Sequence, residues 1–378
     1  MKIAIICEVL GEANNGTTLA ALNLINYLKS QGHDVRVVCP DEDKRGLPGY
    51  YILPKAGLVN TLIKRNKLNL AKFDKDIIYS AVHDADIVHF MVPLFIARAT
   101  SKYINELGIP MTAGFHAQAQ NFTSHIGLLH SKAPNRWIYG WYDRNLFCRV
   151  QAIHYPTQFI RDVFESTMKR KTNGYVISNG VNDMFKPNPQ PKPEALKDKY
   201  CIVFTGRFSQ EKSQMTLLKA VAGSKYEEKI QIILCGNGPA EKQLKKWAGK
   251  HLTNQPVMGF FSRAELLGIL NYSDLYCHPA EAELEGIACL EAIACGLVPV
   301  IADSPDCATK NFALDPHCLF PVNDSAALTS RIDWFIEHPQ EKAKLREKYI
   351  AESVHYDQKQ CMREMENMFL REIENGKA

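Results

Sequence analysis

The segments Lys2-Ile-Ala-Ile-Ile-Cys7 and Asp34-Val-Arg-Val-Val-Cys39 decide the fold, because they have the pattern of two strands separated by one helix. Both are short and rich in Ile and Val, which is typical of strands buried in a parallel sheet. Residues 17–31 carry apolar side chains at helical spacing, and Gly32 follows where helices commonly end. The residues expected on or beside the buried face of this helix are Leu19, Leu22, Asn23, Leu24, Ile25 and Leu28. This unit predicts a parallel sheet covered by helices on both faces.

The same alternation continues through the chain and restarts once. Further strands are expected at residues 87–90, 110–115, 152–154 and 175–177, and, after a proline-rich loop at residues 179–193, at 201–205, 230–235, 274–277 and 298–301. Residues 325–374 have a helical pattern rich in Glu and Lys. We therefore predict an α/β fold with two Rossmann-like doubly wound domains, residues 1–180 and 181–355, facing a cleft.

Composition excludes several classes of protein. The net charge of +4 on 378 residues is too small to indicate nucleic-acid binding. Eleven cysteines are scattered, mostly in apolar runs and without a Cys-x-x-Cys pair, which predicts reduced, buried thiols in a cytosolic protein. The opening apolar run is too short for a signal peptide, and none approaches the roughly 20 residues of a spanning helix. We therefore expect a cytoplasmic protein whose contact with a membrane, if it has one, is peripheral.

The stretch from Glu283 to Glu291, Glu-Leu-Glu-Gly-Ile-Ala-Cys-Leu-Glu, predicts a binding site. It places two carboxylates around a small-residue turn that opens an apolar helix. Free amides at a helix start suit phosphates, and carboxylates suit sugar hydroxyls. Glu291 lies within an otherwise apolar helix, where burial of an acid without a partner is costly. Two surface acids of a helix cap are the alternative, and Glu285 is a third acid nearby.

Two cations follow the first strand of the second domain. Arg207 and Lys212 stand five residues apart after Gly206, near a predicted helix start, where they can clamp a diphosphate. A solvated basic pair is the alternative. The loop Cys235-Gly-Asn-Gly-Pro239 follows the next strand, and its backbone could contact a nucleotide.

The first domain offers two weaker candidates. Gly16 precedes the first helix, where a small residue lets a ligand approach, although an ordinary helix cap is the preferred interpretation of this residue taken alone. His116 follows the strand at residues 110–115 and can bind a sugar hydroxyl, whereas a structural histidine is the alternative.

Other segments carry charge or aromatic rings. The triplets Asp41-Glu-Asp43, Asp74-Lys-Asp76 and Asp84-Ala-Asp86 are interpreted as structural and not as metal ligands. Residues 55–73 resemble a basic amphipathic helix that can lie on an anionic membrane, or else a normal surface helix. The aromatic residues 136–144 could line an acceptor pocket, meet a bilayer or pack between domains.

In their order along nearly the whole chain, these motifs resemble glycosyltransferase family 4, retaining sugar transferases of GT-B fold. The matching segments are Lys2-Ile-Ala-Ile5, Gly16, Gln31-Gly-His-Asp-Val35, Asp86-Ile-Val-His89, Gly108-Ile-Pro110 through His116, Val176-Ile-Ser-Asn-Gly-Val181, Phe185-Lys-Pro187, Thr205-Gly-Arg207 through Lys212, Gly236-Asn-Gly-Pro239 and the paired glutamates. Residues 116–125 loosely resemble the bacterial diacylglycerol glucosyltransferase branch. The chain departs from the family at Glu285, often a bulky residue, and at Asn15-Gly16, often Gly-Gly.

The resemblance implies roles for individual residues. His116 would face the donor sugar near its anomeric carbon, while Arg207 and Lys212 would hold the diphosphate and stabilise it as a leaving group. The remaining donor-binding residues implied are Gly16, Asn237, Met258, Gly259, Glu283, Gly286, Ile287, Ala288 and Glu291, with Glu283 on the sugar hydroxyls, Glu291 on the ribose and the pair 258–259 near the base. No bound metal or other cofactor is expected. The final helix, residues 356–378, would cross back to the first domain.

The resemblance also implies a function. We expect a retaining transferase that moves a hexose from a UDP-sugar to an acceptor hydroxyl, on a membrane lipid such as diacylglycerol or on a cell-envelope glycan precursor. Two alternatives stay open. One is a nucleotide-sugar 2-epimerase of the same fold, and the other is a non-catalytic, glycosyltransferase-like partner subunit.

Overall fold

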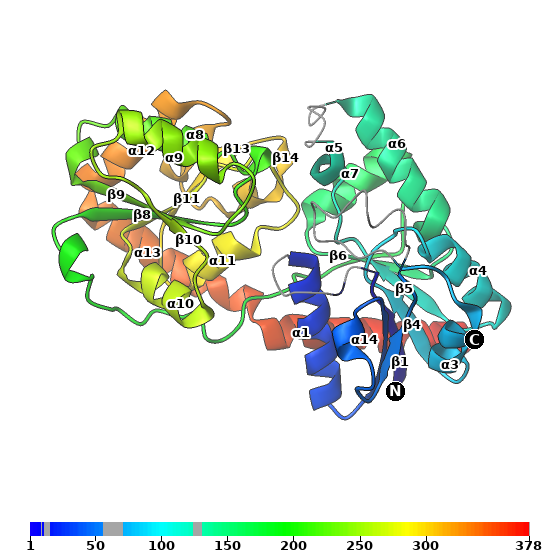
Figure 1. The fold of residues 1–378 in the computed structure, drawn as a ribbon. Helices are drawn as coiled ribbons and strands as arrows, with labels where there is room; N and C mark the ends of the chain where they lie inside the picture. Colours follow the sequence, from blue (N-terminus) through cyan, green and yellow to red (C-terminus); the bar gives the residue numbers. More distant parts are fainter. Residues whose placement is uncertain (9, 11–15, 56–70, 124–130, 378) are drawn as a thin grey trace. The chain divides into compact units, whose positions relative to one another are not determined.

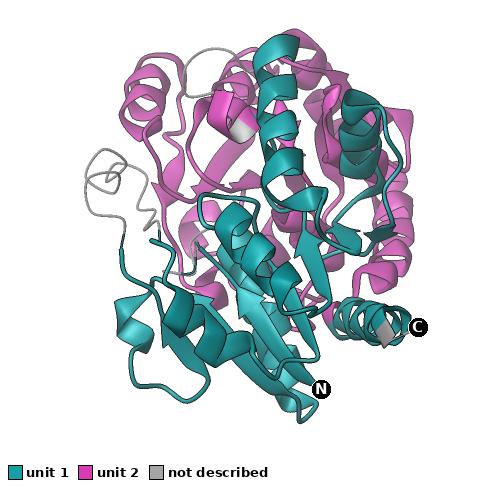
Figure 2. Ribbon diagram, turned by 90° about the vertical axis from the view of Figure 1, so that its right-hand side faces the viewer, with its two compact units in different colours: residues 1–119, 130–179, 359–378 teal, residues 120–129, 180–358 magenta. Residues whose placement is uncertain are grey.

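The computed structural model describes residues 1–8, 10, 16–55, 71–123 and 131–377. The chain divides into two compact units. Unit 1 comprises Met1–Ala119, His130–Asn179 and Lys359–Ala378, and unit 2 comprises Gln120–Leu129 and Gly180–Gln358 (Figure 2). Unit 1 is therefore assembled from both ends of the chain, whereas most of unit 2 is continuous in sequence.

Unit 1 is built on a parallel sheet of seven strands in the order β3-β2-β1-β4-β5-β6-β7. The strands are β1 (Lys2–Ile6), β2 (Asp34–Cys39), β3 (Tyr50–Ile52), β4 (Ile87–Phe90), β5 (Met111–Gly114), β6 (Ala152–Tyr155) and β7 (Gly174–Val176). The order reverses direction between β1 and β4. In doubly wound sheets the carboxyl ends of the strands beside such a reversal form the usual ligand crevice.

Helices cover the sheet of unit 1. They are α1 (Gly16–Ser30), α3 (Lys75–Val82), α4 (Ala97–Glu106), α6 (Lys132–Tyr142), α7 (Gln158–Met168) and α14 (Gln358–Lys377), as labelled in Figure 1. The last helix, α14, shares one apolar core with α1, β1 and β2, to which it contributes Met362, Met365, Met368 and Phe369. His33 Nε2 and Glu366 Oε1 form a hydrogen bond of 2.6 Å beside that core. The end of the chain is thus part of the core of unit 1.

Unit 2 repeats the same topology with six parallel strands in the order β10-β9-β8-β11-β13-β15. The strands are β8 (Tyr200–Thr205), β9 (Ile230–Cys235), β10 (Val257–Gly259), β11 (Leu275–His278), β13 (Pro299–Asp303) and β15 (Leu319–Pro321), and β12 (Ala282–Glu283) pairs with β14 (Asp306–Cys307) outside this sheet. Here the order reverses between β8 and β11. The crevice rule therefore points to the segments that follow these two strands.

Two helical layers enclose the sheet of unit 2. The helices are α8 (Gln214–Ala222), α9 (Glu241–His251), α10 (Arg263–Tyr272), α11 (Ile287–Ala294), α12 (Ser325–Glu337) and α13 (Pro339–Ser353), and α5 (Gln120–Thr123) is a further short helix grouped with this unit. In Figure 1, α8, α9 and α12 lie on one face of the sheet, and α10, α11 and α13 on the other. Both faces of every central strand are buried, which explains their continuous apolar character.

The predicted α/β fold of two doubly wound domains is confirmed by the two sheets. Every strand expected from the sequence is present within one or two residues at each end, and Gly32 adopts the expected left-handed conformation with φ of +81°. The sequence did not predict β3, β10 or β15, which have three residues each. Between Val181 and Glu194 the described chain forms neither helix nor strand, as expected for the proline-rich loop. Ten of the eleven cysteines are buried, and Cys148 is exposed.

Candidate functional site

The segment that follows β8 places two cations at the reversal point of unit 2. Gly206 turns the chain with φ of +147°, a conformation that side-chain-bearing residues rarely adopt. The Gln214 amide then donates to the carbonyl of Arg207 at 2.7 Å, which holds the backbone while the Arg207 side chain remains exposed. Lys212 ends the short 3-10 turn Gln210–Lys212 just before α8. The backbone is thus fixed by protein contacts, whereas the Arg207 guanidinium stays available to an anion.

The glycine loop after β9 packs directly on the segment after β8. A Cβ atom at Gly236 would lie 2.0 Å from the carbonyl oxygen of Gly206, and one at Gly238 would lie 2.3 Å from that of Phe208. The Phe208 amide donates to the carbonyl of Asn237 at 2.8 Å. These glycines therefore serve the close approach of two backbone segments. In this loop the side chain of Asn237 is exposed and could contact a ligand.

The segment after β11 leads into the start of helix α11. Gly286, the N-cap of α11, has φ of +87°, and a Cβ atom there would lie 2.1 Å from Cγ2 of Thr309. The N-cap glycine supplies no side-chain cap, and the first amides of a helix are suited to bind anions. The expected small-residue turn before the helix is therefore formed, and only glycine fits at its apex.

Glu283 and Lys212 meet in this structure. Their side chains form an ion pair between Oε2 and Nζ, and both are about one-fifth exposed. Burial works against both charges, but mutual attraction prevails, so the pKa of Lys212 lies above its ordinary value and the pKa of Glu283 lies below. Both groups are thus charged near neutral pH. The pair places a cation suited to phosphate beside a carboxylate suited to hydroxyls.

Glu291 and Arg207 remain outside this ion pair. Glu291 lies on α11, and its burial raises its pKa to about 7, an effect that the nearby Arg263 partly offsets. A carboxyl group poised near neutral pH is typical of functional sites. Glu285, the third acid, is buried. The structure therefore keeps the two predicted acids, Glu283 and Glu291, in different electrostatic surroundings.

Met258 and Gly259 form the end of β10, next to the glycine loop. The Gly236 amide donates to the carbonyl of Gly259 at 2.7 Å, which ties the two loops together. Met258 is half-buried, and Phe260 beside it is 69% exposed. The predicted donor-binding residues of unit 2 thus follow β8, β9, β10 and β11 at one edge of the sheet.

In unit 1 the structure brings Gly16 and His116 together. The Thr17 hydroxyl, one residue into α1, donates to the carbonyl of His116 at 3.2 Å. The His116 ring folds back over β5, where a Cβ atom at Gly114 would lie 2.4 Å from its Nε2. Nothing described lies within 4 Å of a Cβ built on Gly16. Both residues therefore lie at the carboxyl ends of the strands of the first sheet, close to the point where the strand order reverses.

Three histidines share the interior of unit 1. The His116 and His154 rings meet edge to face with centroids 5.3 Å apart, and burial lowers the pKa of His89 to about 3 and that of His154 to about 4. Burial also lowers the pKa of His116 well below its usual value. His116 Nε2 is buried without a hydrogen-bond partner among the described residues. His116 is therefore a neutral imidazole with one unused ring nitrogen.

Sequence reasoning missed two buried residues beside these sites. Glu8 follows β1, accepts from the Ile96 amide at 3.1 Å, and has a pKa that burial raises to about 8. His278 ends β11 with Nε2 3.8 Å from Glu283 Oε2. In both cases the signal was present, since an ionisable residue directly after or at the end of a buried strand lies at the functional edge of a parallel sheet.

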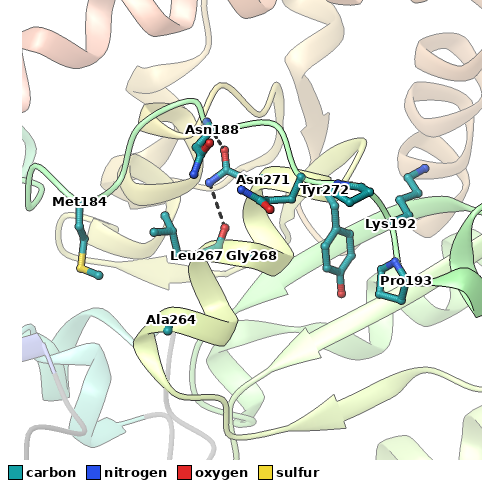
Figure 3. A pocket seen from close by; sticks show the side chains of 11 residues that line it. Met184, Asn188, Lys192, Pro193, Ala264, Leu267, Gly268, Asn271 and Tyr272 are labelled. Carbon is teal, nitrogen blue, oxygen red and sulfur yellow. Dashed lines mark hydrogen bonds between the residues drawn. The ribbon is translucent and has the colours of Figure 1, made fainter.

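A separate pocket of about 640 Å³ lies between the proline-rich loop and α10 (Figure 3). Met184, Asn188 and Lys192 line it from the loop, and Ala264, Leu267 and Tyr272 from the helix. The Asn188 amide donates to Asn271 Oδ1 at 2.6 Å and closes one end of the pocket. None of the predicted donor-binding residues lines this pocket.

The Asp triplets have structural partners. Asp41 and Asp74 cap short helices, and the Asp84 carboxylate accepts from Lys2 at 2.6 Å. Within the described ranges, no group of three or more His, Cys, Asp or Glu side chains is arranged to hold a metal ion.

The predicted membrane-binding segment at residues 55–73 lies largely outside the described residues. In the part of the chain that the structure covers, no helix has the length and apolar character needed to cross a bilayer. The aromatic segment 136–144 lies on α6 and the turn after it, where Trp137 is 66% exposed and Tyr139 and Tyr142 are buried.

Comparison with known proteins identifies similar chains. Two family models match in tandem, Glycosyltransferase Family 4 over residues 14–184 and Glycosyl transferases group 1 over residues 185–353. An α-monoglucosyldiacylglycerol synthase from Streptococcus pneumoniae is 23% identical, over 80% of this chain and 71% of its own. A phosphatidyl-myo-inositol mannosyltransferase from Mycobacterium leprae is 25% identical, over 93% of this chain and 90% of its own.

A solved structure shares the fold. Anabaena Alr3699/HepE in complex with UDP superposes with a TM-score of 0.78 at 17% identity, and the match covers 98% of this chain and all of that chain. The two tandem models together span most of the sequence, and the two sheets have the topology that the resemblance implied. The chain therefore belongs to glycosyltransferase family 4, the retaining glycosyltransferases of GT-B fold.

Proposed function

We propose that the chain transfers a hexose from a UDP-sugar to a hydroxyl group of a membrane lipid such as diacylglycerol, with retention at the anomeric carbon. The observation that carries the proposal is the Lys212–Glu283 ion pair beside the glycine-capped N-terminus of α11. A diphosphate and a sugar joined to it require just such neighbouring cationic and acidic groups. The similarity to a diacylglycerol-modifying glucosyltransferase supports the lipid acceptor.

In the proposed mechanism, Arg207, Lys212 and the α11 amides stabilise the departing diphosphate. Charge develops on the leaving oxygen in the transition state, and donors already in place there are worth more than donors in water. Glu283 binds the transferred sugar, Glu291 the ribose and His116 the region of the anomeric carbon. The leaving phosphate assists deprotonation of the acceptor hydroxyl on the same face. Binding to the cytoplasmic face of a membrane would then be peripheral.

The donor and acceptor are tested by a screen. Radiolabelled UDP-glucose and GDP-mannose are each incubated with diacylglycerol in vesicles, with a glycolipid and with a soluble sugar. Product from UDP-glucose and diacylglycerol, with an α-anomer by NMR, is the expected result. Product from GDP-mannose alone would reject the UDP donor, and a changed donor without an acceptor would indicate an epimerase.

Charge removal tests the site itself. Arg207→Ala and Lys212→Ala are each expected to lower turnover by roughly a hundred- to a thousand-fold, the range for loss of a transition-state donor. Lys242→Ala, an exposed cation on α9 of the same unit, is the matched control and should retain full turnover. Undiminished turnover in both Arg207→Ala and Lys212→Ala would reject the proposed leaving-group clamp.

A further inference from the structure

His278 is a buried histidine whose chemistry the proposed mechanism leaves unused. It is 1% exposed at the end of β11, and its Nε2 atom has no hydrogen-bond partner among the described residues. A buried polar atom without a partner is costly, so its persistence calls for an explanation. The charged group that faces this atom is the Glu283 carboxylate, 3.8 Å away.

The neighbours of His278 favour one of its two neutral tautomers. Thr205 Oγ1 lies 3.0 Å from the Tyr276 hydroxyl, which in turn lies 3.5 Å from His278 Nδ1. A carboxylate can only accept, so a proton on the nitrogen that faces Glu283 is the favourable arrangement. Nδ1 is then the acceptor, and Tyr276 donates to it. The arrangement favours a neutral imidazole with its N–H directed at Glu283.

The neutral state of His278 agrees with its surroundings. Burial lowers its pKa to about 4, even though Glu283 acts in the opposite direction. Burial also raises the pKa of Tyr276 well above its ordinary value, so its hydroxyl keeps the proton that this arrangement requires. Lys212, the other charged group in this cluster, likewise disfavours an imidazolium.

A bound diphosphate would compete with Glu283 for the Lys212 ammonium. A diphosphate carries more charge than one carboxylate and draws the Lys212 ammonium toward itself. Glu283 would then lose its charged partner, although the Leu284 amide still donates to it, and a largely buried carboxylate without a counter-charge is disfavoured. A shift of about 1 Å would bring it within hydrogen-bond distance of His278 Nε2.

We infer that donor binding exchanges the partner of Glu283: Lys212 moves to the diphosphate, and the Nε2–H of His278 takes its place on the carboxylate. His278 is then a positioning residue that acts through Glu283, holding the carboxylate against the sugar hydroxyls. The inference rests on the proposed function, since it assumes that the diphosphate and the sugar bind here. It makes the free Lys212–Glu283 ion pair a resting state of the site.

The exchange predicts that loss of the His278 donor weakens the binding of UDP-glucose but hardly changes the binding of UDP. Affinity for UDP-glucose and for UDP is measured by calorimetry with wild-type protein and with His278→Phe, which keeps the ring and removes the donor. When UDP binds, water fills the sugar position and can hydrate Glu283. We therefore expect His278→Phe to change the affinity for UDP by less than about threefold. UDP-glucose binding should weaken about ten- to a hundred-fold, the range for a hydrogen bond to a charged group.

Three further variants test whether His278 acts through Glu283. His278→Gln restores an N–H donor and should recover part of the UDP-glucose affinity. Tyr276→Phe removes the donor to Nδ1 and should have a smaller effect of the same kind. In a Glu283→Gln background, which lacks the charged partner, His278→Phe should add little, because coupled residues give non-additive effects in a double-mutant cycle.

The outcomes separate the exchange from the proposed function. Wild-type affinity for UDP-glucose in His278→Phe, or an equal loss for UDP and UDP-glucose together with a lower melting temperature, would overturn the exchange and leave the proposed function standing. Full additivity with Glu283→Gln would overturn it as well. If the wild-type protein binds neither ligand, the proposed function fails and the exchange fails with it.

Discussion

Unit 1 and unit 2 have the same strand order around their reversal points but different chemistry at that edge. In unit 1 the strand ends carry Glu8, with a pKa raised to about 8, and buried neutral histidines including His116. In unit 2 they carry the Lys212–Glu283 ion pair and the exposed Arg207. The shared topology therefore provides the place for a ligand, whereas the residues after each strand decide its charge.

The two units also differ in how the chain completes them. The core of unit 1 requires α14 from the far end of the sequence, and the core of unit 2 does not. Phe369→Ala should therefore destabilise unit 1 by about 3–5 kcal/mol, as is typical of a fully buried Phe. Leu370→Ala is the adjacent control, because Leu370 is 41% exposed. The urea midpoint of unfolding is measured for both variants, with limited proteolysis as the probe. Equal midpoints for Phe369→Ala and Leu370→Ala would contradict the contribution of α14 to the core.

The glycines at the two helix starts provide the next comparison. Gly286→Ala should cost about 2 kcal/mol or more, because an alanine would be held at positive φ and would clash with Thr309. Gly16→Ala should change stability by less than about 0.5 kcal/mol, since no described atom lies within 4 Å of a Cβ atom at Gly16. Thermal unfolding checks both variants. A destabilised Gly16→Ala would show that α1 begins under strain, and would remove the comparison.

Glu8 in unit 1 and Glu291 in unit 2 both have raised pKa values, so a pH series tests each unit separately. Folding raises the pKa of Glu8 to about 8, so its contribution to stability is present below pH 4.5 and is lost as the pH rises through 8. Glu8→Gln does not titrate, and should therefore gain about 2 kcal/mol relative to wild type between pH 5.5 and 7.5. Unfolding free energies at both pH values provide the measurement. Burial lowers the pKa values of His89 and His154, so the stability that these neutral histidines contribute is lost as the pH falls below 6.5. This loss is the same in wild type and in Glu8→Gln, and therefore does not affect the difference between them. A constant difference between the two proteins would refute a raised pKa at Glu8.

The smallest expected effect concerns Glu291, whose pKa of about 7 lies close to neutral. If its carboxylate binds the ribose, protonation competes with binding, and UDP-glucose affinity should rise about tenfold from pH 6 to pH 8. Calorimetry at several pH values should show this rise in the wild-type protein and a flat profile in Glu291→Gln. Glu8→Gln is the matched control and should keep the wild-type profile. A pH-dependent Glu291→Gln would assign the titration to another group.

Local pattern predicted the strands that are long and buried on both faces, such as β1, β2 and β9, because continuous apolar runs leave little choice of structure. It did not predict β3, β10 and β15, since three residues at or near a sheet edge have no recognisable period. In the candidate site, Lys212 and Glu283 were predicted from the sequence, whereas Glu8 and His278 were not. The Lys212–Glu283 pairing was not predicted either, because these residues are 71 positions apart, and the Ile96 amide that donates to Glu8 is 88 positions away from it. Such contacts exist only once the sheet has brought the strand ends together.

The distribution of thiols gives the molecule a native reporter of unfolding. Cys148 is the exposed cysteine, whereas Cys7, Cys39 and Cys361 are enclosed in unit 1 and the other seven in unit 2. A short pulse of an alkylating mass tag on the native protein should therefore label one site. Extra tags read out by peptide mapping would then tell which unit opened first, and when, without any label being engineered into the chain.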